Sequence, residues 1–175
     1  VSTANVSCTA ITYTISGTTD GATVTATGST VSNTVTTTAG TYSLSAKYGD
    51  VVTLTATKTG YTCTVAGSPI TLNGDATANV SCTANTYTVG GTNGYGASVS
   101  ISGSSVTGQS AKTTSPYSFN AKSGDVVTLT ATKTGYTCTV AGSPITVGTA
   151  NVSTANVNCT ANTYTVGGTN TDGAS

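Results

Sequence analysis

Apolar and polar residues alternate along most of this 175-residue chain. In the stretch VVTLTATKT, Val52, Leu54 and Ala56 stand at every second position, with threonines between them. The stretch TYSLSAK repeats this pattern around Tyr42 and Leu44. Successive side chains of a strand point to opposite faces, so a period of two predicts half-buried β-strands. No stretch repeats apolar residues at the helical spacing of i, i+3 and i+4.

Glycine-rich turns separate the alternating stretches, among them SGTTDGA, KYGD and LNGD. They leave roughly seven strand signals per repeat, the pattern of a two-sheet antiparallel sandwich. Thr accounts for about a quarter of the residues, and β-branched side chains suit a pleated surface. The sequence therefore predicts an all-β fold.

Long internal repeats organise the chain. The stretch GDVVTLTATKTGYTCTVAGSPIT occupies residues 49–71 and returns unchanged at residues 124–146, a shift of 75 residues (124 − 49 = 75). A shorter phrase reads NVSCTA from Asn5 and from Asn79, and NVNCTA from Asn156. A period of about 75 residues is longer than a solenoid repeat and suits a small sandwich domain. We therefore expect tandem Ig-like antiparallel β-sandwich repeats.

These repeats predict four segments. They are the end of a preceding repeat (residues 1–8), a first repeat (9–82), a second repeat (83–159) and the start of a third (160–175). A sandwich that stopped after its first strands would leave a sheet edge unpaired. Two interpretations therefore stay open: the chain is a window onto a longer polymer, or a neighbouring subunit supplies the missing strands.

Charge excludes several classes of function. Charged residues make up 6% of the chain and the net charge is zero, with no His. No basic face is available for nucleic acid or anionic lipid, and the apolar runs are far shorter than the roughly 20 residues that cross a bilayer. We expect neither a nucleic-acid partner nor membrane insertion. Without His or Glu, acid–base and nucleophilic catalysis lack their usual members, so we expect no enzyme activity, cofactor or metal site.

A few polar residues remain as candidates for other roles. The TDG tripeptides at Thr19–Gly21 and Thr171–Gly173 offer one carboxylate each, too few for a tight calcium site. Asp50 and Asp125 are expected to form turns. The recurring lysines are expected to be solvated residues that discourage edge-to-edge pairing; they are Lys47, Lys58, Lys122 and Lys133.

Three tyrosines near turns could stack on a sugar ring, but Trp is absent and we favour packing in the core or on the surface for them; they are Tyr48, Tyr95 and Tyr117. Four N-x-S/T sequons could accept N-linked glycans in a host with the required machinery; they begin at Asn5, Asn79, Asn151 and Asn158. Alternation predicts that Asn79 and Ser81 point outward while Val80 and Cys82 point inward. O-linked sugars on the Thr faces would help to keep so uncharged a surface in solution.

The stretch TYTISGTTDGATVTATGS, followed by GTYSLSAKYGDVVTLTATKTGYT, resembles the carboxypeptidase regulatory-like and prealbumin-like modules of secreted bacterial proteins. Those modules read G-T-V, then G-A-x-V-x-V, then G-x-Y-x-F, then Y-x-V-x-A-x-K-x-G-Y. The matching residues are Gly17, 21–24, 40–44 and 52–61, and in the second repeat Gly91, 96–99, 117–119 and 127–136. The continuation TCTVAGSPIT…NVSCTANTYTVGG looks like cysteine-containing tandem repeats of bacterial surface proteins and adhesins. The resemblance implies an Ig-like sandwich in an exported array, without inherited catalytic residues.

Five widely spaced Cys in a chain without His favour structural disulfides over a metal site. Two pairing schemes respect the repeat. The first joins Cys63 to Cys82 and Cys138 to Cys159, and leaves Cys8 for an upstream partner. The second joins Cys8 to Cys63 and Cys82 to Cys138, and leaves Cys159 for a downstream partner. We favour the first, which closes loops of about 20 residues across the junctions, worth roughly 3 kcal/mol each in the chain-entropy model.

Together these features predict a structural segment of an extracellular fibre or adhesin stalk. Its localisation would be extracellular or at the cell surface, where disulfides persist. Its partners would be further copies of itself, as a covalent array or as filament neighbours. The alternative is an adhesin module that binds glycans or another surface.

Overall fold

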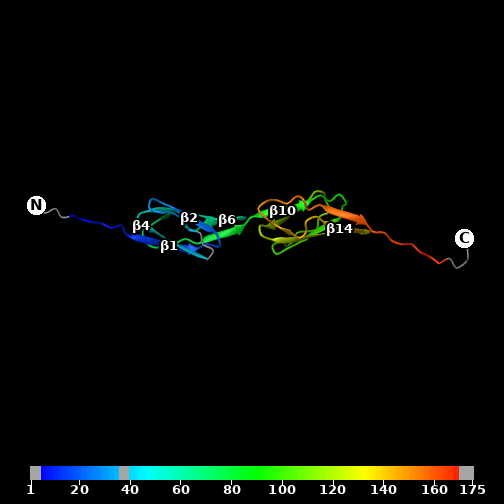
Figure 1. The fold of residues 1–175 in the computed structure, drawn as a ribbon, viewed down its shortest axis with the longest axis horizontal. Helices are drawn as coiled ribbons and strands as arrows, with labels where there is room; N and C mark the ends of the chain where they lie inside the picture. Colours follow the sequence, from blue (N-terminus) through cyan, green and yellow to red (C-terminus); the bar gives the residue numbers. More distant parts are fainter. Residues whose placement is uncertain (1–4, 36–39, 170–175) are drawn as a thin grey trace. The chain divides into compact units, whose positions relative to one another are not determined.

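The computed structural model describes residues 5–35 and 40–169. The regular elements in this part of the chain are all strands, and no helix long and apolar enough to cross a membrane occurs there. The chain divides into two compact units, Val1–Asn85 and Thr86–Ser175. Figure 1 shows both units as strands joined by loops, which confirms the all-β prediction.

The first unit arranges its strands in two sheets and a ribbon. One sheet has the order β4-β1-β8, the other has the order β3-β2-β5-β7, and β6 and β9 form the ribbon. Strand β1 pairs antiparallel with β4 and parallel with the short β8. The strands are β1 (Thr12–Thr18), β2 (Thr23–Thr27), β3 (Ser32–Val35), β4 (Thr41–Lys47), β5 (Val51–Thr57), β6 (Tyr61–Val65), β7 (Ile70–Thr71), β8 (Ala76–Thr77) and β9 (Val80–Ala84).

The second unit repeats most of these pairings. Strands β10 and β12 pair as β1 and β4 do, β11-β13-β15 corresponds to β2-β5-β7, and β14-β16 corresponds to the ribbon. Where β3 pairs with β2 in the first unit, the second has an isolated bridge between Val99 and Lys112. The strands are β10 (Thr86–Gly91), β11 (Ser98–Ser102), β12 (Tyr117–Lys122), β13 (Val126–Thr132), β14 (Tyr136–Val140), β15 (Ile145–Thr146) and β16 (Val157–Ala161).

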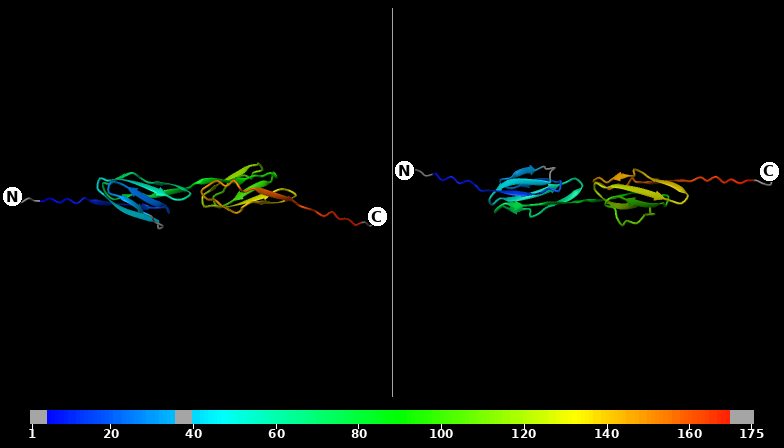
Figure 2. Two further views of the ribbon diagram at one scale, coloured as in Figure 1. Left: turned by 45° about the horizontal axis from the view of Figure 1, so that its top comes forward. Right: turned by 90° about the horizontal axis from the view of Figure 1, so that it is seen from below.

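Each unit buries one apolar core between its sheets. In the first unit, Ile15 of β1 and Leu44 of β4 belong to the same buried cluster as Val24 of β2 and Val52 of β5. The second unit builds the same kind of cluster from both of its sheets. The predicted alternation is confirmed, since the burial of β5 alternates from Val51 to Leu54. Multiple sheets around a shared core are consistent with a β-sandwich (Figure 2).

A close approach of two backbones fixes the first strand of each unit. A Cβ atom at Gly17 would lie 2.2 Å from the carbonyl O of Ala78, and one at Gly91 would lie 2.5 Å from that of Ala155. Tyr42 donates its hydroxyl to the same Ala78 carbonyl at 2.5 Å. Glycine is therefore required there, because any side chain would push the two segments apart.

The boundary between the units lies three residues beyond the predicted one. The expected division between residues 82 and 83 falls inside β9, whereas the compact units divide after Asn85. The predicted boundary was placed at Cys82. Strand β9, however, continues its pairing with β6 as far as Ala84, which lies opposite Tyr61. A single residue, Asn85, then separates β9 from β10.

Candidate functional site

Each unit carries a two-stranded ribbon closed by a disulfide. Cys63 of β6 is bonded to Cys82 of β9, and Cys138 of β14 is bonded to Cys159 of β16. The Cα–Cα distance is 4.1 Å in both pairs, somewhat shorter than the about 4.5 Å between directly opposed residues at a non-hydrogen-bonded position of an antiparallel ladder. These are the pairs of the first scheme. Two disulfides in a small β protein are typical of an oxidising compartment.

Local alternation explains why these cysteines meet. Thr62 and Thr64 on either side of Cys63 are exposed, whereas Cys63, Val65 and Cys82 pack against the core of the first unit. The register places Cys63 directly opposite Cys82 and Val65 opposite Val80. The ribbon is thus held by side chains on its inner face, while its outer face carries hydroxyls.

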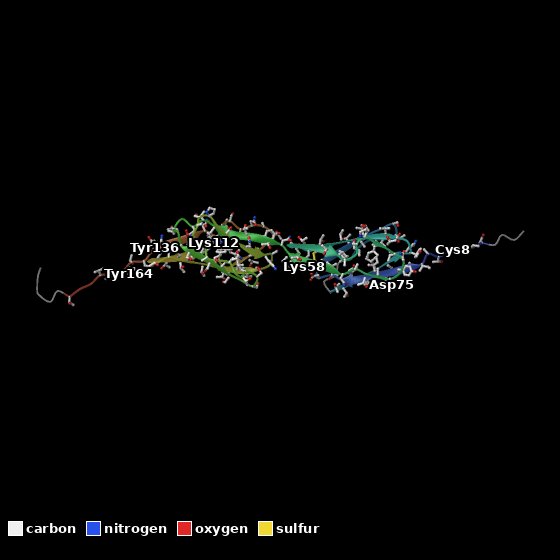
Figure 3. The ribbon with its side chains drawn as sticks, turned by 180° about the vertical axis from the view of Figure 1, so that it is seen from behind. Cys8, Lys58, Asp75, Lys112, Tyr136 and Tyr164 are labelled. Carbon is white, nitrogen blue, oxygen red and sulfur yellow. A yellow bond between two sulfur atoms is a disulfide. The ribbon has the colours of Figure 1, made fainter. Side chains whose placement is uncertain are left out.

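Cys8 is exposed and forms no disulfide within the described chain. It belongs to a VSCTA pentapeptide identical to that of β9, yet its surroundings differ. Val6 is 87% exposed, whereas the corresponding Val80 is 5% exposed. A similar contrast holds near the other end of the chain, where Val166 is 97% exposed and its counterpart Val89 is fully buried. Cys8 and Tyr164 both lie on segments outside the strands (Figure 3).

Side chains satisfy backbone groups along strand edges. Ser68 Oγ donates to the carbonyl O of Leu54 and accepts from its N–H, at 2.9 and 2.8 Å. The Gln109 amide does the same for Asn120 of β12, at 2.7 and 2.8 Å. Further carboxylate and amide oxygens accept N–H groups of β1 and β10; they belong to Asp75, Asn79 and Asn151. Edges finished in this way are less open to pairing with another chain.

Asp50 has a larger role than the predicted turn. Its carboxylate accepts hydrogen bonds from the hydroxyls of Ser29 and Thr30 and from the Thr30 N–H. The Ser29 hydroxyl, followed by the Thr30 hydroxyl, lowers the pKa of Asp50 below its usual value. Asp125 is held in the same way by the hydroxyls of Ser104 and Ser105. Asp50 therefore ties the turn before β5 to the distant loop at Ser29 and Thr30, and Asp125 ties the turn before β13 to the loop at Ser104 and Ser105.

Lys58 and Lys133 are half-buried rather than freely solvated, unlike the expectation for them. Lys58 Nζ donates to the carbonyl O of Asp20 at 2.7 Å and lies 4.2 Å from the ring centroid of Tyr61. Lys133 repeats this with the carbonyl O of Tyr95 and the ring of Tyr136, at 2.5 and 4.7 Å. A carbonyl and a ring face are both attractive to an ammonium group, so the lysines are drawn onto the surface. Lys47 and Lys122 are exposed.

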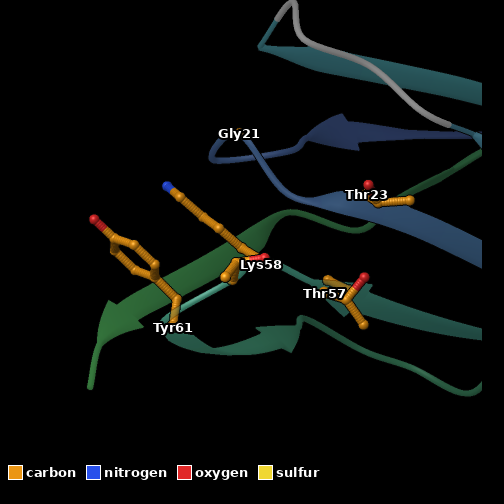
Figure 4. A pocket seen from close by; sticks show the side chains of 7 residues that line it. Gly21, Thr23, Thr57, Lys58 and Tyr61 are labelled. Atoms are coloured by element: carbon orange, nitrogen blue, oxygen red, sulfur yellow. The ribbon is translucent and has the colours of Figure 1, made fainter. Parts of the chain in front are cut away.

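Beside each of these lysines lies an open hollow. The first has a volume of about 570 Å³ and the second of about 520 Å³. Threonine hydroxyls, one lysine and one tyrosine line the first hollow (Figure 4). Matching residues of the repeat line the second, with Ser98 in the place of Thr23.

The structure separates the three candidate sugar-stacking tyrosines. Tyr117 is 3% exposed, and its hydroxyl donates to the Ala155 carbonyl, so Tyr117 packs in the core, as favoured, and is not free to stack on a sugar. Burial raises the pKa of Tyr117, as it does that of Tyr42. Tyr48 and Tyr95 are 63% and 41% exposed and belong to different units. The alternation of Tyr117 with buried Phe119 and Ala121 is the sequence signal that identifies it as a core residue.

The first TDG tripeptide is part of the fold. Thr19 is fully buried, and the Asp20 carboxylate accepts the N–H of Cys82 at 2.8 Å. The second tripeptide, Thr171–Gly173, lies outside the described residues. Asp20 therefore supports the disulfide-bearing strand β9.

The four sequon asparagines are all exposed. Asn79 and Ser81 point outward and Val80 inward, as predicted, with Cys82 half-buried. The Oδ1 atoms of Asn79 and Asn151 accept the N–H groups of Thr18 and Thr88 at 3.1 and 2.9 Å. A glycan would be attached through Nδ2, so these bonds are compatible with modification.

The described side chains thus form disulfides within each unit and hydrogen bonds to backbone groups at strand edges. Within residues 5–35 and 40–169, no three Cys or Asp side chains gather into a group that could hold a metal ion. Comparison of the chain with family models, with curated proteins and with solved structures finds no match.

Proposed function

We propose that this chain is a structural segment of an extracellular fibre or adhesin stalk, built from tandem Ig-like sandwiches. The observation that carries the proposal is the position of the disulfides. In each unit the last strand, β9 or β16, is cross-linked to β6 or β14. The strand that leads out of the unit is therefore covalently tied to the unit's interior.

This position has a mechanical consequence. Tension on the chain enters the first unit through β1 and leaves it through β9. Because Cys63 is bonded to Cys82, force on β9 passes directly to β6, and the 19-residue separation between the cysteines cannot be pulled out. The second unit protects a separation of 21 residues between Cys138 and Cys159 in the same way. Stretching thus stops short of the full chain length even when a unit unfolds.

The surface supports the same role. Only 6% of residues are charged, and threonine hydroxyls cover the outer faces of β5 and β13. Edge groups are met by side chains such as Ser68 and Gln109. A repeated unit with closed edges and an uncharged hydroxyl coat suits a long extracellular shaft whose copies lie close together. The proposed partners are accordingly further copies of the chain.

Single-molecule force spectroscopy on the full chain tests this function. With both disulfides formed, each unit should unfold in one event whose contour gain excludes the residues between its cysteines. Reductant should lengthen each event by roughly 60–75 Å, at about 3.3–3.6 Å per residue. The matched control is the double variant Cys63→Ser, Cys82→Ser, in which one of the two events should be long without reductant. Equal contour gains with and without reductant would contradict the mechanical role.

The hollows beside Lys58 and Lys133 favour a second candidate, a glycan-binding adhesin module. Each combines hydroxyls, an ammonium group and a tyrosine in a repeated arrangement. A glycan array probed with the full chain would test it. Saturable and selective glycan binding that is lost in the double variant Lys58→Gln, Lys133→Gln would support the adhesin function. Equal binding by this variant would exclude the hollows as the glycan-binding sites.

A further inference from the structure

The LNGD turn of the first unit holds an Asn-Gly pair between two anchored residues. Leu72 is fully buried, and both its N–H and its carbonyl O form backbone hydrogen bonds. Asp75, labelled in Figure 3, accepts the N–H of Thr14 at 2.8 Å. Between them Asn73 is exposed and lies outside the strands, and within residues 5–35 and 40–169 no hydrogen bond holds its side chain. A Cβ atom at Gly74 would meet nothing within 4 Å.

The chain contains a second Asn-Gly pair, Asn93 and Gly94, in which the asparagine is held by the fold. Asn93 is 2% exposed. Its Nδ2 donates to the carbonyl O atoms of Ala97 and Thr113 at 2.7 and 3.3 Å, and its Oδ1 accepts the N–H of Ala97 at 3.1 Å. A Cβ atom at Gly94 would meet nothing within 4 Å, as at Gly74. The two pairs therefore share an open glycine and differ in whether the asparagine side chain is fixed.

This difference decides whether an asparagine can react with its own backbone. An asparagine followed by glycine closes a five-membered imide when the glycine nitrogen reaches Cγ of the asparagine. Glycine favours the approach because it has no Cβ and few backbone restrictions. The asparagine side chain must also rotate toward that nitrogen. Asn73 rotates without leaving a partner, whereas Asn93 must first break three hydrogen bonds in the interior of the second unit.

We infer that Asn73 is a site of spontaneous deamidation, which converts the LNGD turn to a mixture of aspartate and isoaspartate while Asn93 stays intact. Asparagine is among the thermolabile residues of proteins, and exposure, an open glycine and an unheld side chain coincide at Asn73 alone of the two pairs. The inference is independent of the proposed function, because it needs only the fold of the first unit and water.

The reaction balances with water as its only co-reactant. The Gly74 nitrogen loses its proton and attacks Cγ of Asn73, a new N–C bond forms, and ammonia leaves with that proton. Water then opens the imide at one of its two carbonyl groups. Opening at the side-chain carbonyl gives aspartate, and opening at the backbone carbonyl gives isoaspartate, whose main chain runs through Cβ and Cγ. One amide and one water thus become one carboxylic acid and one ammonia, without oxidation or reduction.

The modification changes the edge at which β1 pairs with β8. Isoaspartate adds one carbon to the main chain between Leu72 and Asp75, which are both anchored, so we expect Asp75 to lose its hydrogen bond to the Thr14 N–H. Deamidation also adds a negative charge beside the Asp75 carboxylate in a chain of zero net charge. The second repeat continues with VGTA from Val147 and has no Asn-Gly pair there. The change is therefore confined to the first unit.

The test incubates the full chain, with both disulfides formed, in a weakly alkaline buffer below its melting temperature. After reduction, alkylation and digestion in mild acid, one tryptic peptide, residues 59–112, carries both Asn-Gly pairs. Mass spectrometry with fragmentation that distinguishes aspartate from isoaspartate should show Asn73 reacting about tenfold faster than Asn93 or more, because three hydrogen bonds hold Asn93. In denaturant with reductant these bonds are lost, and the ratio of the two rates should fall toward one.

Two matched variants identify the attacking nitrogen. Gly74→Ala introduces a methyl group into open space and should slow the reaction of Asn73 about tenfold by shielding the nitrogen and restricting the backbone. Gly94→Ala is the control and should leave the rate at Asn73 unchanged. Equal rates at Asn73 and Asn93 in the folded chain, a ratio that persists in denaturant, or a rate unaffected by Gly74→Ala would overturn the proposal.

Amide hydrogen exchange at Thr14 checks the effect on β1. The isoaspartate form, separated by chromatography, should exchange the Thr14 N–H several-fold faster than the parent, because its acceptor on Asp75 is withdrawn. Asn73→Asp carries the same charge without the added main-chain carbon and should keep the parent's rate. Equal exchange at Thr14 in the isoaspartate form and in Asn73→Asp would contradict the expected loss of the hydrogen bond.

Discussion

Ser68 Oγ binds both the N–H and the carbonyl O of Leu54, at 2.8 and 2.9 Å, and so acts as one residue of a neighbouring strand. Strand β7 begins at Ile70 and pairs with Val52 and Val51, so its backbone does not extend to the position opposite Leu54. Ser143 does the same for Leu129 in the second unit, at 2.9 and 3.0 Å. A single hydroxyl therefore extends the sheet edge where the chain turns away.

Replacing Ser68 by Ala should lower the free energy of unfolding of the first unit by about 1–3 kcal/mol, because two partly buried backbone groups lose their partner. Urea denaturation followed by circular dichroism measures the change. Ser45→Ala, at an exposed position of β4, is the control and should stay within about 0.5 kcal/mol of the parent. A Ser68→Ala midpoint equal to that of the control would show that water replaces the hydroxyl at no cost.

Gly17→Ala should destabilise the first unit by about 1–3 kcal/mol or more, because its methyl group would lie 2.2 Å from the Ala78 carbonyl. Gly91→Ala should have the same effect on the second unit. Gly74→Ala is the control, since a Cβ atom there meets nothing within 4 Å. Thermal unfolding of the three variants checks this. Equal melting temperatures for Gly17→Ala and Gly74→Ala would contradict the close backbone approach.

Asp50 should make stability depend on pH in the acid range. Its pKa is lowered in the folded state by the Ser29 and Thr30 hydroxyls, so between the folded and unfolded pKa values the unfolded chain binds more protons. The contribution is therefore complete above the unfolded value of about 3.9 and is lost as the pH falls through the folded value. Denaturation midpoints measured between about pH 2 and pH 6 should fall less steeply on acidification in Asp50→Asn than in the parent. The same pH dependence of the denaturation midpoint in Asp50→Asn and in the parent would show that Asp50 does not cause the loss of stability in acid.

Reduction of the disulfides should lower the free energy of unfolding by roughly 3 kcal/mol per unit, since each closes a loop of about 20 residues. Guanidinium denaturation with and without reductant measures the loss. The double variant Cys138→Ser, Cys159→Ser should weaken the second unit alone and leave the first unit sensitive to reductant. A reductant effect on neither unit would indicate that the ribbons are held by packing alone.

Much of the fold follows from the sequence because its signals are local. The alternation of Val52 and Leu54 with threonine predicts which face of β5 is buried. The recurrence of the cysteines in each repeat limits the possible disulfide pairings, and the favoured one contains Cys63–Cys82. The edge closures could not be predicted in this way. Ser68 and Leu54 are 14 residues apart, and Asn79 and Thr18 are 61 residues apart. These contacts depend on the tertiary arrangement of loops that are distant in sequence, and the periodicity of apolar residues carries no information about that arrangement.

The NVSCTA hexapeptide occurs twice, and its first copy can serve as an internal reference for the amide hydrogen-exchange rates of the second. Chemical exchange rates depend on the residue and its neighbours, and these are shared by residues 5–10 and 79–84. In dilute solution, amides of the first copy should exchange at the rate of an open peptide, while those of β9 should exchange only when the ribbon opens. The ratio of the two rates would give the opening equilibrium of β9 from a single sample, with no separate unfolded standard.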